Sequence, residues 1–167
     1  PDAVAAALSA LRHKTTGSLI AVLGAGGERD PGKRAAMGEA AAAHADLVIV
    51  TDDNPRSENP ATIRAAVLAG ANSVDSSTPN SSIPNSSTPP LPRPRVREIG
   101  DRSAAIRAAV AVAGEGDTVV ILGKGHESGQ EIAGVVHPFD DRAELRAALL
   151  EHRSGQSAAD PAPGGST

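Results

Sequence analysis

The sequence predicts an α/β protein with a doubly wound, mostly parallel sheet and helices on both faces. Apolar runs without alternation, such as Asp46–Val50, are typical of strands that are buried on both sides of a parallel sheet. Such runs alternate along the chain with segments of helical periodicity, an order that favours repeated strand–helix–strand units. Three of the runs end in loops rich in glycine or charge. We expect these loops to meet at the carboxyl edge of the sheet, where this class of fold binds ligands.

The first part of the chain divides into alternating helices and strands. Asp2 is the expected cap of the first helix, and Gly70 is the expected glycine after the end of the third. A glycine-rich loop, Gly24–Arg34, follows the first strand, and the helix after it is rich in alanine, which lets it lie close to the sheet. The pattern predicts a helix, strand, helix, strand and helix over residues 2–13, 18–23, 32–45, 46–50 and 61–70.

The composition then changes abruptly. Residues 72–94 are almost wholly Ser, Thr, Asn and Pro, which cannot bury enough apolar area to offset their ordering entropy. We therefore expect a disordered insertion within one domain, residues 1–153, and a disordered polar tail, residues 154–167. Between these segments the pattern predicts an exposed strand over residues 95–99, a helix over 103–113, a third buried strand over 117–122 and a short strand or hairpin over 131–136. A last helix follows, headed by a capping box of Asp141 and Glu144.

Composition excludes several classes of protein. The 167 residues suffice for one domain and include no cysteine, no Trp or Tyr and one Phe, with a formal charge of −4. Nucleic acid is not an expected partner, because aromatic platforms and a basic surface are missing. No apolar run approaches the roughly 20 residues of a membrane span. We expect a soluble, monomeric, cytoplasmic protein with no membrane partner. Because the chain opens at Pro1 without an initiator methionine, we also expect it to be a piece of a longer one.

The polar stretch Thr51–Pro60 directly follows the strand at residues 46–50. Acids, an amide and a guanidinium are grouped around its prolines, so this stiff cluster can both donate and accept hydrogen bonds. Such a cluster suits a zwitterion, a small molecule with both a carboxylate and an ammonium group. An ordinary polar turn, marked by Asn54-Pro55, explains the stretch about equally well.

The two glycine-rich loops carry less specific signals. Gly27–Lys33 fits the start of a phosphate-binding loop, but Arg34 replaces the hydroxyl residue that would hold magnesium, and the third glycine of a dinucleotide fingerprint is also missing. A tight turn and anion capture by Arg29 both stay open. In Gly123–Glu127 the glycines permit close backbone approach, and Glu127 offers a carboxylate for an ammonium group. No histidine lies at metal-ligand spacing from another, so no metal site is expected in this chain.

Three motifs occur together and in order, and they carry a resemblance to a known family. The motifs are Gly24-Ala25-Gly26-Gly27-Glu28-Arg29-Asp30-Pro31-Gly32-Lys33-Arg34, Asp53-Asn54-Pro55-Arg56 and Gly123-Lys124-Gly125-His126-Glu127. They resemble the C-terminal domain of the Mur ligase family, closest to the members that add meso-diaminopimelate. The resemblance covers the chain to about Glu151 and leaves out the insertion and the tail. Pro1-Asp2 is similar to the end of the family's hinge motif.

The resemblance implies a function and a set of site residues. The family members in question add meso-diaminopimelate to UDP-N-acetylmuramoyl-L-alanyl-D-glutamate in peptidoglycan biosynthesis. They use ATP and Mg²⁺, which a central domain outside this sequence mainly binds, so the chain alone is expected to be inactive. Arginine forks are implied to bind carboxylates, and a glutamate with a glycine backbone is implied to bind the distal amino-acid end. The implied contacts with meso-diaminopimelate are Arg29, Asp53, Asn54, Pro55, Arg56, Gly123 and Glu127.

Two alternatives stay open. One is a stand-alone Rossmann-like module that binds an amino acid or a nucleotide. The other is a relative that adds lysine, which lacks the second carboxylate that Arg56 is expected to bind. No role for the insertion at residues 72–94 follows from the sequence.

Overall fold

The computed structural model describes residues 1–74, 95–125 and 127–159, and a four-stranded parallel sheet forms its centre. The strands are Leu19–Ala25 (β1), Leu47–Asp52 (β2), Arg95–Glu98 (β3) and Thr118–Leu122 (β4). Their order is β3-β2-β1-β4, and all three pairings are parallel. The chain moves from one side of β1 to the other between β3 and β4, which confirms the predicted doubly wound class.

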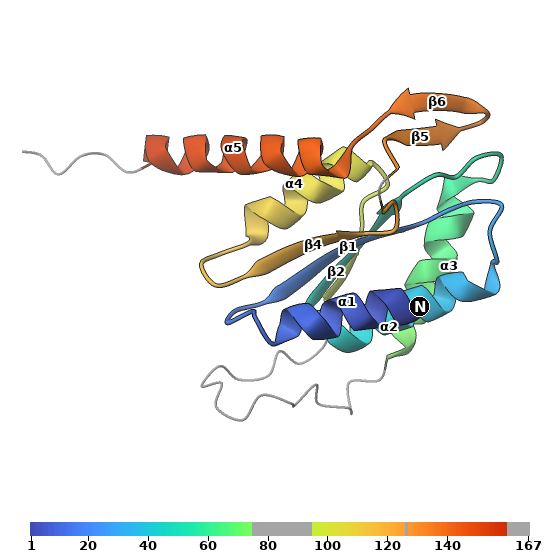
Figure 1. Cartoon of the computed structure of the whole chain (residues 1–167), viewed down its shortest axis with the longest axis horizontal. Coiled ribbons are helices and arrows are strands. Elements are labelled where there is room, and N and C mark those ends of the chain that lie inside the picture. The colour runs from blue at the N-terminus through green and yellow to red at the C-terminus, as the bar shows by residue number, and fades with distance from the viewer. Residues whose placement is uncertain (75–94, 126, 160–167) are drawn as a thin grey trace, which may run out of the picture.

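Helices cover both faces of the sheet (Figure 1). They are Asp2–Arg12 (α1), Gly32–His44 (α2), Pro60–Ser73 (α3), Arg102–Val112 (α4) and Asp141–Ala159 (α5). Because successive side chains of a strand point to opposite faces, β1 contributes to two apolar layers. Leu19, Ala21 and Leu23 pack with α1, α2 and α3, whereas Ile20 and Val22 pack with α4 and α5. No helix among the described residues is long and apolar enough to cross a membrane.

The helices α2 and α3 pack backbone against backbone. A Cβ added at Gly38 of α2 would lie 1.9 Å from the carbonyl oxygen of Val67, and one added at Gly70 of α3 would lie 1.8 Å from that of Ala35. Gly70 is therefore an interior helix residue at a close approach. The prediction that it ends the helix is wrong, because α3 continues to Ser73.

The two edge strands are less buried than the central pair. β3 is mostly exposed, as predicted, but β4 is only half-buried, so the prediction of a third buried strand is wrong. The reason is topological, because β4 pairs with β1 alone within the described part of the chain. The region after β4 forms the predicted hairpin, Gly129–Ile132 (β5) and Val135–Pro138 (β6), as a separate antiparallel pair. In Figure 1 this hairpin stands beyond the ends of the central strands.

The N-terminus of α5 is capped by Asp140 and not by the predicted box of Asp141 and Glu144. Asp140 Oδ1 accepts a hydrogen bond from the Arg142 N–H at 2.8 Å, and this bond above all holds the pKa of Asp140 below its usual value. Asp141 is instead engaged by Arg102 of α4, whose Nε donates to Asp141 Oδ1 at 2.7 Å.

Three further boundaries differ from those predicted. α1 begins at Asp2, which is the first helical residue and makes no side-chain cap. Residues 72–73, expected in the insertion, close α3, and residues 75–94 of the expected insertion lie outside the described residues. α5 continues to Ala159, into the expected tail, whose remaining residues 160–167 also lie outside the described part.

The variant Gly70→Ala is expected to destabilise the protein, because the added methyl group meets backbone atoms of α2. Overpacking of this kind costs about 1–3 kcal/mol of unfolding free energy, which chemical denaturation followed by circular dichroism measures. Gly155→Ala is the matched control, because a Cβ added at this helical glycine meets no heavy atom within 4 Å, and helix propensity then favours the alanine. Equal losses in both variants would contradict the close approach of α2 and α3.

Candidate functional site

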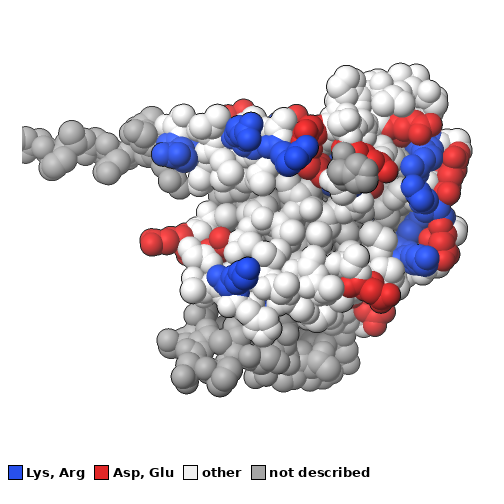
Figure 2. Space-filling view, viewed as in Figure 1, with Lys and Arg blue, Asp and Glu red and all other residues white. Residues whose placement is uncertain are grey.

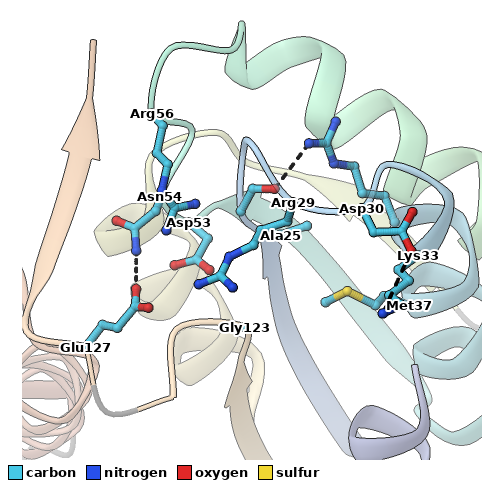
Figure 3. Close-up of a pocket in the computed structure, with 12 residues that line it drawn as sticks. Ala25, Arg29, Asp30, Lys33, Met37, Asp53, Asn54, Arg56, Gly123 and Glu127 are labelled. Atoms are coloured by element: carbon cyan, nitrogen blue, oxygen red, sulfur yellow. Dashed lines mark hydrogen bonds and ion pairs between the residues drawn. The ribbon is translucent and has the colours of Figure 1, made fainter. Parts of the chain in front are cut away.

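Three loops leave the carboxyl ends of β1, β2 and β4 and meet at one edge of the sheet. They surround a hollow of about 440 Å³, within the range of small-molecule sites, which Figure 3 shows in close-up. Basic and acidic side chains lie next to one another along this edge (Figure 2), so the hollow offers both signs of charge. Six of the seven predicted contact residues are among those that line it: Arg29, Asp53, Asn54, Arg56, Gly123 and Glu127.

The turn between β2 and α3, Asp53–Arg56, is held by backbone hydrogen bonds from two other segments. In the β1–α2 loop, the Gly27 N–H donates to the Asn54 carbonyl oxygen at 2.7 Å. On the other side, Arg56 exchanges two backbone hydrogen bonds with the hairpin, at 2.9 and 2.7 Å. Arg56 has a φ of +53°, a left-handed conformation that residues other than glycine seldom adopt. The surrounding bonds are what hold the turn in this conformation.

The Asn54 side chain connects the turn to Glu127. Its Oδ1 accepts a hydrogen bond from the Glu131 N–H at 2.8 Å and faces the Lys124 Nζ at 3.5 Å. Two donors on one side fix which end of the amide is the oxygen, so the Nδ2 donates to Glu127 Oε2, a contact drawn in Figure 3. Within the described residues, the other carboxylate oxygen of Glu127 has no hydrogen bond and is available to a ligand.

The two predicted carboxylate-binding arginines are held differently. Arg56 Nη1 donates to the Gly27 carbonyl oxygen at 2.6 Å, and its Nε lies 3.7 Å from a carboxylate oxygen of Glu131. These contacts orient the guanidinium and leave further N–H donors for a ligand. Arg29 is exposed and makes neither a hydrogen bond nor an ion pair in the described part of the chain. Its guanidinium is directed toward Asp53 in Figure 3.

The remaining two predicted residues act through the backbone or lie behind the hollow. Gly123 has a φ of +113°, and a Cβ added to it would lie 2.3 Å from the Gly24 carbonyl oxygen, so only glycine fits where this loop crosses β1. Pro55 is fully buried and does not line the hollow.

Two residues for which the sequence predicts no role also support the turn. Lys124 Nζ lies 3.1 Å from Asp53 Oδ1, and Gln130 Nε2 donates to the Asp53 carbonyl oxygen at 2.7 Å. The sequence did carry a signal for Lys124, a lysine between two glycines directly after a predicted strand. No local signal marks Gln130, because its contact with Asp53 spans 77 positions of the chain.

A bidentate salt bridge near the start of α2 connects the end of the β1–α2 loop to the segment before α3. Arg34 Nη1 and Nη2 donate to the two carboxylate oxygens of Glu58 at 2.9 and 2.8 Å, and Nη2 also donates to the Gly26 carbonyl oxygen at 3.2 Å. The Arg34 guanidinium, followed by the Glu28 N–H, lowers the pKa of Glu58 to about 2. Arg34 is thus engaged in holding the loop.

The described residues do not fit Mg²⁺, one of the two cofactors that the resemblance implies. Arg34 occupies the position of the magnesium-binding hydroxyl of a phosphate-binding loop, and its guanidinium is turned to Glu58. Across residues 1–74, 95–125 and 127–159, no group of three His, Asp or Glu side chains is arranged to hold a metal ion.

Comparisons with known proteins agree with the fold and the motifs. Residues 1–125 match the family model described as "Mur ligase, glutamate ligase domain". The chain is 56% identical over 149 residues to the UDP-N-acetylmuramoyl-L-alanyl-D-glutamate–2,6-diaminopimelate ligase of Caulobacter vibrioides, covering 89% of this chain and 26% of that protein. It is 54% identical over 154 residues to the ligase of the same name from Corynebacterium efficiens, covering 92% and 27%. A solved structure of a ligase with this name has a TM-score of 0.75 and 41% identity, covering 92% of this chain and 28% of that one.

The fold and the hollow define a doubly wound α/β domain with a hollow of polar lining at the carboxyl edge of its sheet. The chain belongs to the Mur ligase family, as the three motifs indicate. It spans about a quarter of the length of the curated relatives it matches.

The variant Glu58→Gln is expected to change how the thermal stability of the protein depends on pH. The folded-state pKa of Glu58 is about 2 against an ordinary value of 4.5, so the carboxylate stabilises the fold fully above pH 4.5, and this contribution is lost as the pH falls toward 2. The difference in Tm between wild type and Glu58→Gln should therefore be largest near neutral pH and shrink toward pH 2, as thermal unfolding over this range would show.

The control for this series is Glu39→Gln, at an exposed position of α2, which should leave the Tm nearly unchanged. A Tm difference for Glu58→Gln that stayed constant from neutral pH to pH 2 would contradict the assigned ion pair.

Proposed function

We propose that this chain is the amino-acid-binding domain of an ATP-dependent ligase that adds meso-diaminopimelate to UDP-N-acetylmuramoyl-L-alanyl-D-glutamate in peptidoglycan biosynthesis. The relatives from Caulobacter vibrioides and Corynebacterium efficiens bear the name of that ligase. One observation in this chain carries the proposal. The cationic Arg29 and Arg56 and the anionic Glu127 come from three different loops and line the same hollow.

This arrangement of charges suits an amino acid with two zwitterionic ends. In the proposed complex, Arg56 and Arg29 bind the carboxylate of the far end, because a guanidinium fork matches a carboxylate in shape and charge. Glu127, oriented by Asn54, accepts the ammonium group of the same end, and the Gly123 backbone lies close to it. The near end of the ligand, with its own amine, is then free to react.

Binding in this way orients the nucleophile of the ligation. The near amine attacks an activated carboxyl group of the acceptor, and holding one end of the amino acid converts an encounter in solution into a reaction between positioned groups. In the described residues, no group of three His, Asp or Glu side chains is arranged to hold a metal ion. Activation of the acceptor and binding of its UDP-linked part are therefore proposed to belong to the three-quarters of the relatives that this chain does not cover.

The same geometry disfavours the lysine-adding alternative. Lysine has no carboxylate at its far end, so a guanidinium aimed at that end would lose its partner. Arg56 is oriented by Gly27 and lines the hollow, and Arg29 lines it as well. Two cations in this place favour the diacid.

The variant Arg56→Ala is expected to abolish the use of meso-diaminopimelate, because a desolvated carboxylate that loses its charged partner costs about 2–5 kcal/mol. The assay is ligation by a hybrid enzyme in which this chain replaces the matching segment of the Caulobacter vibrioides ligase. Arg153→Ala, at an exposed position of α5, is the matched control and should keep the rate of the unchanged hybrid. An Arg56→Ala hybrid that used meso-diaminopimelate as well as the unchanged one would contradict the proposal.

The chain by itself is expected to catalyse no ATP-dependent ligation, because its described residues provide no phosphate-binding loop and no metal-binding group. Release of ADP and formation of the ligated product are measured with all three substrates present, and the unchanged hybrid enzyme is the positive control. Product formed by the 167-residue chain alone would overturn this expectation.

A further inference from the structure

Lys124 is a buried cation just behind the wall of the hollow. Its side chain is 0% exposed, and its Nζ lies 3.1 Å from Asp53 Oδ1 and 2.8 Å from the Gly129 carbonyl oxygen. The ring of Phe139 lies on another side, with its centroid 5.6 Å from the Nζ. Lysine is almost never fully buried unless it is paired, so this environment is built around the charge.

The ammonium group of Lys124 also helps to fix the orientation of the Asn54 side-chain amide. Its Nζ and the Glu131 N–H both face Asn54 Oδ1, at 3.5 and 2.8 Å. If the amide turned over, its NH₂ group would face these two donors. The arrangement therefore keeps the amide nitrogen directed at Glu127, which it orients by a hydrogen bond.

The partner of Lys124, Asp53, lines the hollow but is largely buried. Its side chain is only 7% exposed, and the Oδ1 that approaches Lys124 is fully buried. A carboxylate without a counter-ion at this place would repel the carboxylate that Arg56 and Arg29 are proposed to bind. Pairing with Lys124 offsets that repulsion.

We propose that Lys124 is a positioning residue of the amino-acid site. Paired with Asp53, it neutralises that carboxylate and fixes the Asn54 amide, so that Asn54 holds Glu127 toward the ligand. This inference rests on the proposed function for the identity of the ligand. The arrangement of the side chains themselves can be tested without any ligand.

The test uses the 167-residue chain and four variants: Lys124→Met, Asp53→Asn, the double variant with both changes, and Lys14→Met as the control at an exposed lysine. NMR follows two ligand-free signals, the side-chain NH₂ resonances of Asn54 and the hydrogen exchange of the Glu131 amide, which donates to Asn54 Oδ1. Chemical-shift titration with meso-diaminopimelate then gives the affinity of each variant.

We expect Lys124→Met to shift the Asn54 resonances, speed exchange at Glu131 and weaken meso-diaminopimelate binding at least tenfold. Lys14→Met should change none of these. The double variant should bind more tightly than Lys124→Met alone, because it no longer leaves an unpaired carboxylate. Such recovery is a non-additive effect, which a merely structural lysine would not produce.

Two results would overturn the inference. One is an Asn54 signal and a Glu131 exchange rate that stay unchanged in Lys124→Met. The other is a double variant whose loss of affinity equals the sum of the single losses, as expected if the two side chains act independently. If Lys124→Met does not fold, the double variant, which leaves no charge unpaired, is compared with wild type. Altered Asn54 signals with reduced affinity then support the inference, and unchanged values overturn it.

A wild-type chain that does not respond to meso-diaminopimelate would instead contradict the proposed function, while the ligand-free signals still decide the role of Lys124.

Discussion

The site depends on a buried polar turn, at the end of an apolar strand, that side chains and backbone groups of other segments hold in place. Asp53 and Asn54 follow β2 directly and are only 5% and 6% exposed. A buried polar group without a partner costs about 1–3 kcal/mol, so the turn is stable only if its surroundings supply donors. The β1–α2 loop, the loop after β4 and the hairpin each supply at least one. Because these partners come from segments far apart in the sequence, the turn holds the edge of the sheet together as one unit, which lowers the ordering cost of binding a ligand.

Salt bridges at this edge of the sheet determine which charged groups remain available to a ligand. Many ionisable groups gather here, yet most of the cations already have a carboxylate beside them: Lys33, Arg34 and Lys124 pair with Asp30, Glu58 and Asp53. Unused hydrogen-bonding capacity remains in the Arg29 guanidinium, in part of the Arg56 guanidinium and in one oxygen of Glu127. Two cations and one anion around a single hollow match a ligand end that carries a carboxylate and an ammonium group. A ligand with only one kind of charge would leave part of this set unpaired.

The sequence predicts what depends on one segment at a time. Apolar runs and helical spacing gave the order of the elements, and the loops after the strands located the edge that carries the site. Contacts between segments that are far apart in the chain could not be predicted from the sequence. A glycine near the end of a helical pattern reads as a terminator, and only the packing of α2 shows that Gly70 is interior. Asp140 and Asp141 are adjacent acids, and Arg102 of another helix decides which of them caps α5. Lys124 stands within a predicted motif, but its role depends on a turn some 70 positions earlier.

A crystal structure of the chain with meso-diaminopimelate bound tests most directly whether the hollow is an amino-acid site. We predict that the far carboxylate of the ligand lies within hydrogen-bond distance of the Arg56 guanidinium, that its ammonium group contacts Glu127, and that Asp53 is still paired with Lys124. A ligand bound outside the hollow, or one whose ammonium group makes no contact with Glu127, would contradict the proposed amino-acid site.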